Sequence, residues 1–183
     1  MKDYSTYSEE ALIDIVTKNP DQIRWIEDPS EAVQLAAINT YCWSIEFIKK
    51  PTLAAQLAAV NRNAPTISRI KNPFHEVKII TVTKHGASID CINNPTEEMK
   101  LLAVKQDGIN LALIKNPSEE VQIEAIRNTT EAYFYVKDYN VIKKTKEYWN
   151  NRFYYYLVKN IFDLTPEQQT EIIEEYEVLQ LFK

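Results

Sequence analysis

Glycine is nearly absent from this chain, which contains only Gly86 and Gly108 among its 183 residues. So low a glycine content suits a fold with few irregular turns, and it excludes a glycine-rich phosphate-binding loop. The two glycines lie 22 residues apart. Each is predicted to end a helix in the left-handed region, where a missing Cβ removes the steric cost.

Cysteine and histidine are equally scarce, with two residues of each. Cys42 and Cys91 are predicted to lie too far apart for a disulfide, so both are expected to be free thiols. His75 and His85 are placed at a helix start and a helix end and are not expected to converge. Motifs such as CxxC, HExxH and GxSxG are absent. We therefore expect no catalytic, cofactor or metal site and no enzyme activity, with a hidden carboxylate site as the alternative.

The chain also lacks an apolar run long enough to cross a bilayer and an apolar N-terminal leader. With 45% hydrophobic and 26% charged residues, it is typical of one soluble globular domain, and a cytoplasmic location is expected. The formal net charge of −5 disfavours broad nucleic-acid binding, although it permits a local basic patch.

What the chain does contain is a repeat with a period of 22 residues. Five prolines mark it: Pro29, Pro51, Pro73, Pro95 and Pro117. Residues 7–28 keep the same register, with Tyr7 at the proline position. A period of this length indicates a solenoid.

Each repeat is predicted to form two short helices. The residue before proline is a good N-cap type in most repeats (Asp28, Asn72, Asn94 and Asn116, with Lys50 the exception), and proline would then be the first helical residue. Glu31, Glu97 and Glu119 follow these caps at capping-box spacing. The first helix is expected to span about 12 residues, roughly 18 Å. A shorter second helix carries the pattern I-x-x-I.

Aliphatic residues recur in the same positions of every repeat. The first such column is Val16, Ile38, Val60, Val82, Val104 and Ile126. The second is Ile23, Ile45, Ile67, Ile89, Leu111 and Tyr133, and the third is Ile26, Ile48, Ile70, Ile92, Ile114 and Val136. A single repeat cannot bury these side chains, whereas stacked neighbours can. A leucine-rich repeat has a similar period, but its L-x-x-L-x-L-x-x-N signature is missing.

We therefore predict an all-α fold: an α-solenoid of about six two-helix repeats of 22 residues over 1–138, followed by C-terminal capping helices over 139–183, in one continuous domain. In the cap, Thr165 is predicted to be an N-cap, Pro166 the first helical residue and Gln168 the partner in a capping box. An apolar stripe follows: Ile172, Ile173, Tyr176, Leu179 and Phe182.

The segment 133–160 is rich in aromatic and basic residues. Because Phe153 to Tyr156 cannot all face inward on one helix, we take this region as the interface candidate. The candidate residues are Lys143, Lys144, Tyr148, Trp149, Arg152, Phe153, Tyr154, Tyr155 and Tyr156. A cap filled with large side chains, a protein interface and a nucleic-acid or nucleotide site all remain open.

Two other patterns have structural explanations. Acidic residues gather at predicted helix starts and lysines at repeat ends, as helix dipoles favour. Another column of the second helix holds Trp25, Phe47, Arg69, Cys91, Leu113 and Tyr135. It is expected to belong to the core, with an apolar groove as the alternative.

The unit N-P-S-E-E-V-Q-[LI]-x-A-[VI]-x-x-x-G-x-x-[LI]-x-x-I-K, clearest at 94–115 and 116–137, resembles an uncharacterised tandem-repeat family common in phages and gut bacteria. The resemblance covers about residues 7–138 and carries no functional residues. It implies a phage or mobile-element origin and is silent on activity. The repeat array and the aromatic C-terminal segment predict a non-enzymatic protein-binding module, and the family context suggests a phage-encoded inhibitor of a host defence complex acting in the host cytoplasm. A monomer and a homodimer are both compatible with the sequence.

Overall fold

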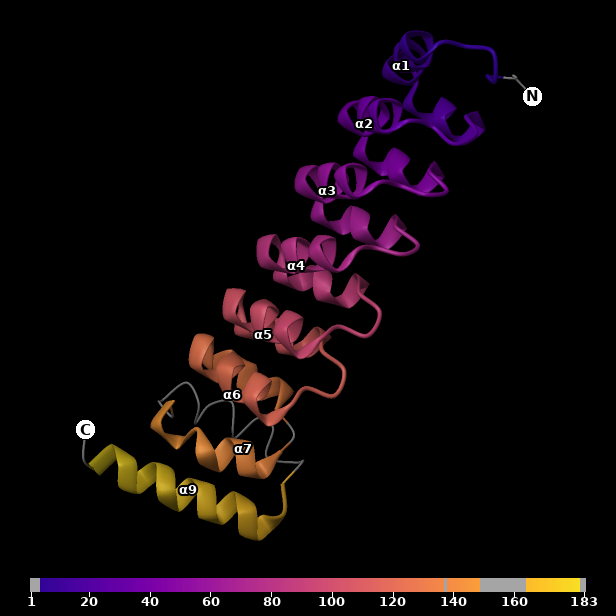
Figure 1. Ribbon diagram of the computed structural model, residues 1–183. Helices are drawn as coiled ribbons and strands as arrows, with labels where there is room; N and C mark the ends of the chain where they lie inside the picture. Colours follow the sequence, from indigo (N-terminus) through magenta and orange to yellow (C-terminus); the bar gives the residue numbers. More distant parts are fainter. Residues whose placement is uncertain (1–3, 137, 149–163, 182–183) are drawn as a thin grey trace. The chain divides into compact units, whose positions relative to one another are not determined.

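The structure is a computed structural model that describes residues 4–136, 138–148 and 164–181 (Figure 1). Within these ranges every regular element is helical and no strand occurs, which confirms the all-α prediction. Six α-helices, each followed by a 3-10 helix, recur at the predicted period of about 22 residues.

Each repeat consists of a ten-residue α-helix and a six-residue 3-10 helix, so the first helix is shorter than predicted and the second has the tighter geometry. The α-helices are α1 (Glu9–Lys18), α2 (Glu31–Thr40), α3 (Leu53–Arg62), α4 (His75–Lys84), α5 (Glu97–Gln106) and α6 (Glu119–Asn128). The 3-10 helices are η1 (Pro20–Trp25), η2 (Cys42–Phe47), η3 (Ala64–Arg69), η4 (Gly86–Cys91), η5 (Gly108–Leu113) and η6 (Thr130–Tyr135). After them come α7 (Tyr139–Lys144), η7 (Lys146–Tyr148) and α9 (Pro166–Leu181).

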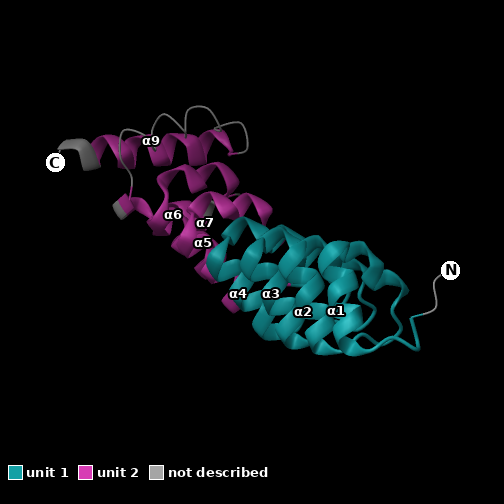
Figure 2. Ribbon diagram, turned by 90° about the horizontal axis from the view of Figure 1, so that it is seen from above, with its two compact units in different colours: residues 1–94 teal, residues 95–183 magenta. Residues whose placement is uncertain are grey.

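The chain divides into two compact units, residues 1–94 and 95–183 (Figure 2). In the first, α1 to α4 pack in chain order as one layer, and η1 to η4 form a second layer beside them. In the second, α5 packs on α6 and α6 on α7, while η5 packs on η6. The predicted boundary between repeats and cap, at residue 138, falls inside the second compact unit.

The α-helices begin two residues later than predicted. The N-cap is the Ser or Thr after the proline, and its hydroxyl accepts a hydrogen bond from a backbone N–H three residues on, as Thr52 does from Ala55 at 3.2 Å. Ser8, Ser30, Thr96 and Ser118 do the same, while Phe74 makes no such bond. The predicted caps before proline, and the capping boxes with Glu31, Glu97 and Glu119, are therefore wrong.

The residue before proline has a different role. Asp28, Asn94 and Asn116 adopt positive φ angles of 46°, 51° and 49°. Proline disfavours the α-helical region for the residue before it, and Asp and Asn tolerate the left-handed region better than other non-glycine residues. These side chains therefore turn the chain into the next repeat instead of capping a helix.

The two glycines do not end helices in the left-handed region, since neither has a positive φ. Gly86 and Gly108 are instead the first residues of η4 and η5. A Cβ on Gly108 would lie 2.2 Å from the Ala125 carbonyl oxygen. The Gly108 N–H donates to Asn128 Oδ1 at 2.9 Å. Glycine is therefore needed here because η5 approaches the end of α6 closely.

The three predicted aliphatic columns are all buried. Their side chains fill the space between the α-helical and 3-10 layers, and each contributes roughly 1.5–3 kcal/mol by burial. The third column extends one repeat further than predicted, because Tyr4, 22 residues before Ile26, is also buried. Its hydroxyl donates to Gln22 Oε1 at 2.7 Å. Residues 4–8 therefore supply a partial layer before the first repeat.

A column of buried glutamines links consecutive repeats and was not recognised from the sequence. Gln34 Nε2 donates to the carbonyl of Pro29 at 2.9 Å, and Gln34 Oε1 accepts from the N–H of Thr52, in the next repeat, at 3.0 Å. Gln56 repeats this arrangement with Pro51 at 3.2 Å and Phe74 at 3.1 Å. Each glutamine thus satisfies backbone groups on both sides of a repeat junction.

Replacing Gln56 by alanine should destabilise the fold, because the Pro51 carbonyl and the Phe74 N–H both lose their buried partner. We expect a loss of about 1–3 kcal/mol in the free energy of unfolding. Urea denaturation followed by circular dichroism measures it. Asn39→Ala, at an exposed position at the end of α2, should stay within about 0.5 kcal/mol of wild type. Equal losses in the two variants would contradict a role for the glutamine bridge.

Gly108→Ala should also destabilise the fold, since the added Cβ would overlap the Ala125 carbonyl and force η5 away from α6. Overpacking of this kind costs about 1–3 kcal/mol. Ala64 and Thr130, at the equivalent positions of η3 and η6, already carry a Cβ, so the requirement for glycine is not common to every repeat. An unchanged thermal midpoint in Gly108→Ala would show that η5 and α6 separate without cost.

Candidate interaction surface

The column predicted to belong to the core is largely exposed on the 3-10 helices, with Phe47 half-buried, so that prediction is wrong. Trp25 is 48% exposed, Leu113 37% and Tyr135 40%. A 3-10 helix has three residues per turn. The residues at the Ile23 and Ile26 positions therefore share the inner side, and the residue at the Trp25 position points away. The prediction failed because it was based on the aromatic and apolar residue types in this column and did not take the geometry of a 3-10 helix into account.

Arginines lie over aromatic rings of neighbouring repeats in the first compact unit. The Arg24 guanidinium carbon lies 3.7 Å from the centre of the Phe47 ring, one repeat later. The guanidinium carbon of Arg69 lies 5.9 Å from the centre of the Trp43 ring, and Arg69 also pairs with Glu46 at 3.5 Å. Cation–π contacts of this type stabilise a surface and occupy the ring faces with the protein's own cations.

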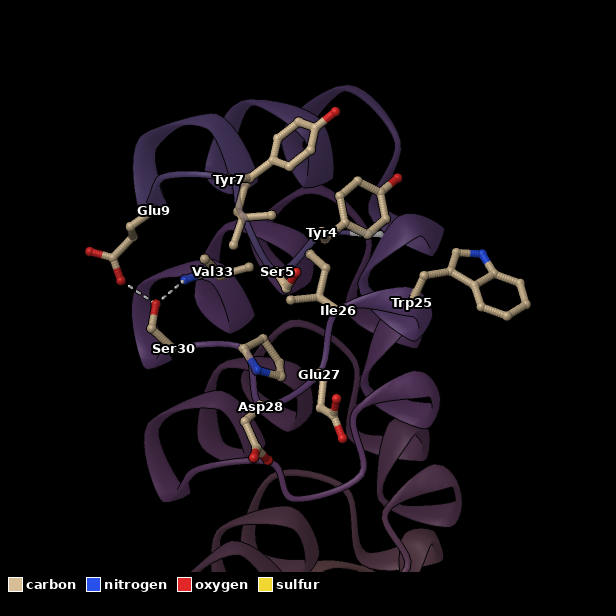
Figure 3. A pocket seen from close by; sticks show the side chains of 12 residues that line it. Tyr4, Ser5, Tyr7, Glu9, Trp25, Ile26, Glu27, Asp28, Ser30 and Val33 are labelled. Carbon is tan, nitrogen blue, oxygen red and sulfur yellow. Dashed lines mark hydrogen bonds between the residues drawn. The ribbon is translucent and has the colours of Figure 1, made fainter. Parts of the chain in front are cut away.

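A hollow at the N-terminal end of the first compact unit has a volume of about 810 Å³ (Figure 3). Tyr4, Tyr7 and Trp25 are its aromatic lining residues, and the Tyr4 and Tyr7 rings meet edge-on with their centres 5.5 Å apart. Its carboxylates are Glu9, Glu27 and Asp28. Aromatic faces and negative charge therefore share one open site.

Two smaller hollows lie further along the same compact unit and differ in charge. One, of about 90 Å³, is lined by Arg24, Lys49 and Lys50 together with Asp28. The other, of about 310 Å³, is lined by Lys71 and Lys78. Basic side chains thus line the later hollows, whereas the first one is acidic.

Three of the nine predicted interface residues lie in the described part of the chain, and all three make internal contacts. Lys143 forms an ion pair with Glu171 of α9, and Lys144 pairs with Glu119 of α6 at 2.6 Å. The Tyr148 hydroxyl accepts a hydrogen bond from Arg127 Nε at 2.9 Å. These contacts hold α7 and η7 against α6 and α9, as expected of a cap.

The other six candidates, Trp149, Arg152, Phe153, Tyr154, Tyr155 and Tyr156, lie outside the described residues. The helix that follows them begins as predicted. The Thr165 N–H donates to Gln168 Oε1 at 2.9 Å and the Gln168 N–H donates to the Thr165 hydroxyl at 3.3 Å, which confirms the capping box. Ile172 and Tyr176 of the predicted stripe are buried.

The acidic residues at the helix starts bind the neighbouring repeat. Glu9 accepts a hydrogen bond from the Ser30 hydroxyl, and Glu97 accepts one from the Ser118 hydroxyl. Hydrogen bonds from its own backbone N–H and from Ser8 lower the pKa of Glu10. The acidic residues at the helix starts therefore have the structural role expected of them at helix N-termini, and Glu9 and Glu97 also link consecutive repeats, which was not predicted.

The described residues contain no cluster of three or more His, Cys, Asp and Glu side chains that could hold a metal ion. Among the same residues, no helix is both long and apolar enough to span a membrane. Cys42 and Cys91 are free thiols, as predicted. Partial desolvation, with the nearby Asp90 carboxylate, raises the pKa of the Cys91 thiol, which disfavours its reactive thiolate form.

Comparison with known proteins gives no match to any family model, curated protein or solved structure. The resemblance to a phage and gut-bacterial repeat family therefore remains an expectation from the repeat unit itself. The N-terminal hollow was also missed from the sequence. The signal that could have found it is the 22-residue register, which places Tyr4 and Tyr7 one repeat before Ile26 and Pro29.

The ion pair between Lys143 of α7 and Glu171 of α9 should stabilise the packing of α9 on α7. The hydrogen bond to Glu171 raises the pKa of Lys143, so the pair is fully formed below the ordinary lysine pKa of 10.5 and is lost as pH rises above the raised value. At pH 7 we expect Glu171→Gln to speed hydrogen exchange in α7 and α9, with α2 and α3 unchanged. Glu174→Gln, at an exposed position of the same helix, is the matched control, and equal exchange in both variants would contradict this role.

Proposed function

We propose that this protein is a non-enzymatic interaction module that binds one protein partner through the exposed position of its 3-10 helices. The observation that carries the proposal is the exposure of the large side chain at this position, which is Trp25 in the first compact unit and Leu113 and Tyr135 in the second. Trp and Tyr are the residue types enriched at the energetic centres of protein interfaces. Because the stack itself does not bury them, they are available to a partner.

Charge and contacts favour a protein over a nucleic acid. The formal net charge is −5, and two lysines of the basic aromatic segment, Lys143 and Lys144, pair with Glu171 and Glu119. A surface that neutralises phosphates needs cations that are free to do so. Binding of nucleic acid or nucleotides through residues 133–160 is therefore the second candidate.

The resemblance of the repeat unit suggests a more specific role, a phage-encoded inhibitor that masks a host defence complex. A helical array with exposed aromatic side chains suits such a role, because masking requires surface complementarity and no chemistry. Partner binding as a monomer or as a homodimer is compatible with this proposal.

Replacement of the exposed column should abolish partner binding. Affinity capture identifies the partner, and calorimetry with the purified pair then compares wild type with a Trp25→Ser/Leu113→Ser/Tyr135→Ser variant. Each interface anchor costs about 2 kcal/mol or more when truncated, so we expect affinity to fall by at least about 100-fold. Leu53→Ser/Phe74→Ser removes exposed apolar side chains from the α-helical layer and should leave the affinity unchanged.

Equal binding by the wild type and the triple variant would overturn this assignment of the surface. Binding of a single-stranded oligonucleotide at low salt, in the absence of any protein partner, would favour the second candidate. Its affinity would then fall steeply as salt is raised.

A further inference from the structure

The N-terminal hollow combines features that recognise a positively charged group. Figure 3 shows Tyr4 and Tyr7 on one side of it, Trp25 at its edge and the Glu27 and Asp28 side chains on the other side. Its volume of about 810 Å³ lies in the range of sites that bind ligands of drug size, about 300–1,000 Å³. It can therefore accept a long side chain together with part of the backbone that carries it.

The described lining of the hollow is acidic, although Asp28 also lines the small neighbouring hollow that contains Arg24, Lys49 and Lys50. Glu9, Glu27 and Asp28 contribute three carboxylates, and the described lining residues include no Lys, Arg or His. The hydrogen bond that Glu9 accepts comes from the neutral Ser30 hydroxyl, so its charge remains. Within the described residues, Glu27 and Asp28 form no ion pair.

The aromatic residues that line the hollow also favour a positively charged ligand. The Trp25 side chain is 48% exposed, and an indole is the best of the aromatic rings at attracting a cation to its face. In the following repeats the chain supplies such cations itself, with Arg24 over Phe47 and Arg69 over Trp43. Aromatic rings on the 3-10 helices of the first compact unit therefore bind guanidinium groups, which is the kind of group proposed for Trp25.

We propose that this hollow binds a lysine or arginine side chain from a basic segment of the partner protein. This inference rests on the proposed function and names the chemistry of the partner. The Glu27 and Asp28 carboxylates would accept hydrogen bonds from the cation, and the Trp25 ring would cover its flat or apolar part. Charge complementarity selects a basic segment over an acidic or purely apolar one.

The test uses a fluorescent Gly-Arg-Lys-Arg-Lys-Gly peptide with acetylated and amidated ends, titrated into the full chain by fluorescence anisotropy. A Gly-Glu-Asp-Glu-Asp-Gly peptide is the probe of opposite charge. We expect only the basic peptide to bind, and its Kd to rise with salt because the contact is electrostatic.

Two variants remove the proposed contacts. Glu27→Gln/Asp28→Asn should weaken the basic peptide about tenfold, which corresponds to about 1.4 kcal/mol. Asparagine is chosen at position 28 because Asn94 and Asn116 adopt the same positive φ in later repeats. Trp25→Ala should weaken binding about three- to tenfold through loss of the cation–π contact. Circular dichroism confirms that each variant is folded.

A matched control separates the site from the overall negative charge. Glu98→Gln/Glu120→Gln also removes two exposed carboxylates, at the starts of α5 and α6, and should leave the Kd within about twofold, since distant exposed charges are screened by salt. Equal weakening by the two double variants would overturn the proposal. So would preferential binding of the acidic peptide. Binding of choline, measured by calorimetry, without any binding of the basic peptide would also overturn it and would indicate a small cationic ligand.

Lys2 lies 22 residues before Arg24 in the sequence, outside the described residues, so the titration is repeated with Lys2→Ala. Unchanged or tighter binding of the basic peptide supports the proposal, and loss of binding overturns it. If the basic peptide fails to bind while partner capture still depends on Leu113 and Tyr135, only this inference fails and the proposed function stands.

Discussion

The structure depends on the burial of aliphatic side chains between repeats that cannot bury them alone. A ten-residue helix beside six residues of 3-10 helix has too little surface of its own to cover Val60, Ile67 and Ile70, and its neighbours in the stack complete the enclosure. The polar groups of the junction are satisfied across the same boundary, since Gln56 joins the carbonyl of Pro51 to the N–H of Phe74. Apolar burial and hydrogen bonding therefore impose one spacing on successive repeats.

This constraint also decides which positions are free for function. Three residues per turn of 3-10 helix commit the Ile23 and Ile26 positions to the interior and leave the Trp25 position outside. The same repetition that builds the core therefore displays one outward position once per repeat, where chemistry varies from Trp25 and Phe47 to Arg69 and Tyr135 without cost to the stack. An outward position whose residue type can vary in this way suits a binding surface on a repeat scaffold.

The period, the all-helical class and the three aliphatic columns were predictable because six copies of one pattern reinforce each other. The starts of the α-helices were not predictable, because a residue such as Asn94 before Pro95 suits either an N-cap or a left-handed turn. The structure distinguishes the two, since the Met99 N–H donates its hydrogen bond to the Thr96 hydroxyl and Asn94 has a positive φ. The 3-10 geometry was hidden because an I-x-x-I pattern fits both kinds of helix. Trp25 was assigned to the core since residue type alone cannot tell the two sides of a short helix apart. Most of the predicted aromatic interface lies outside the described residues, so that prediction stays open.

The layer before the first repeat differs from the layers before the later repeats, and this difference accounts for the position of the acidic hollow. The second repeat receives a side chain from the layer before it, since Arg24 lies over Phe47. Among the described residues, the layer before the first repeat consists of residues 4–8, in which Tyr4 stands at an isoleucine position and Tyr7 at a proline position. That layer supplies enough apolar surface to cover Ile26, but its described residues bring no cation to Trp25, Glu27 or Asp28. Trp25, Glu27 and Asp28 therefore line an open site next to this layer, and under the proposal a basic segment of the partner supplies the cation that residues 4–8 do not bring.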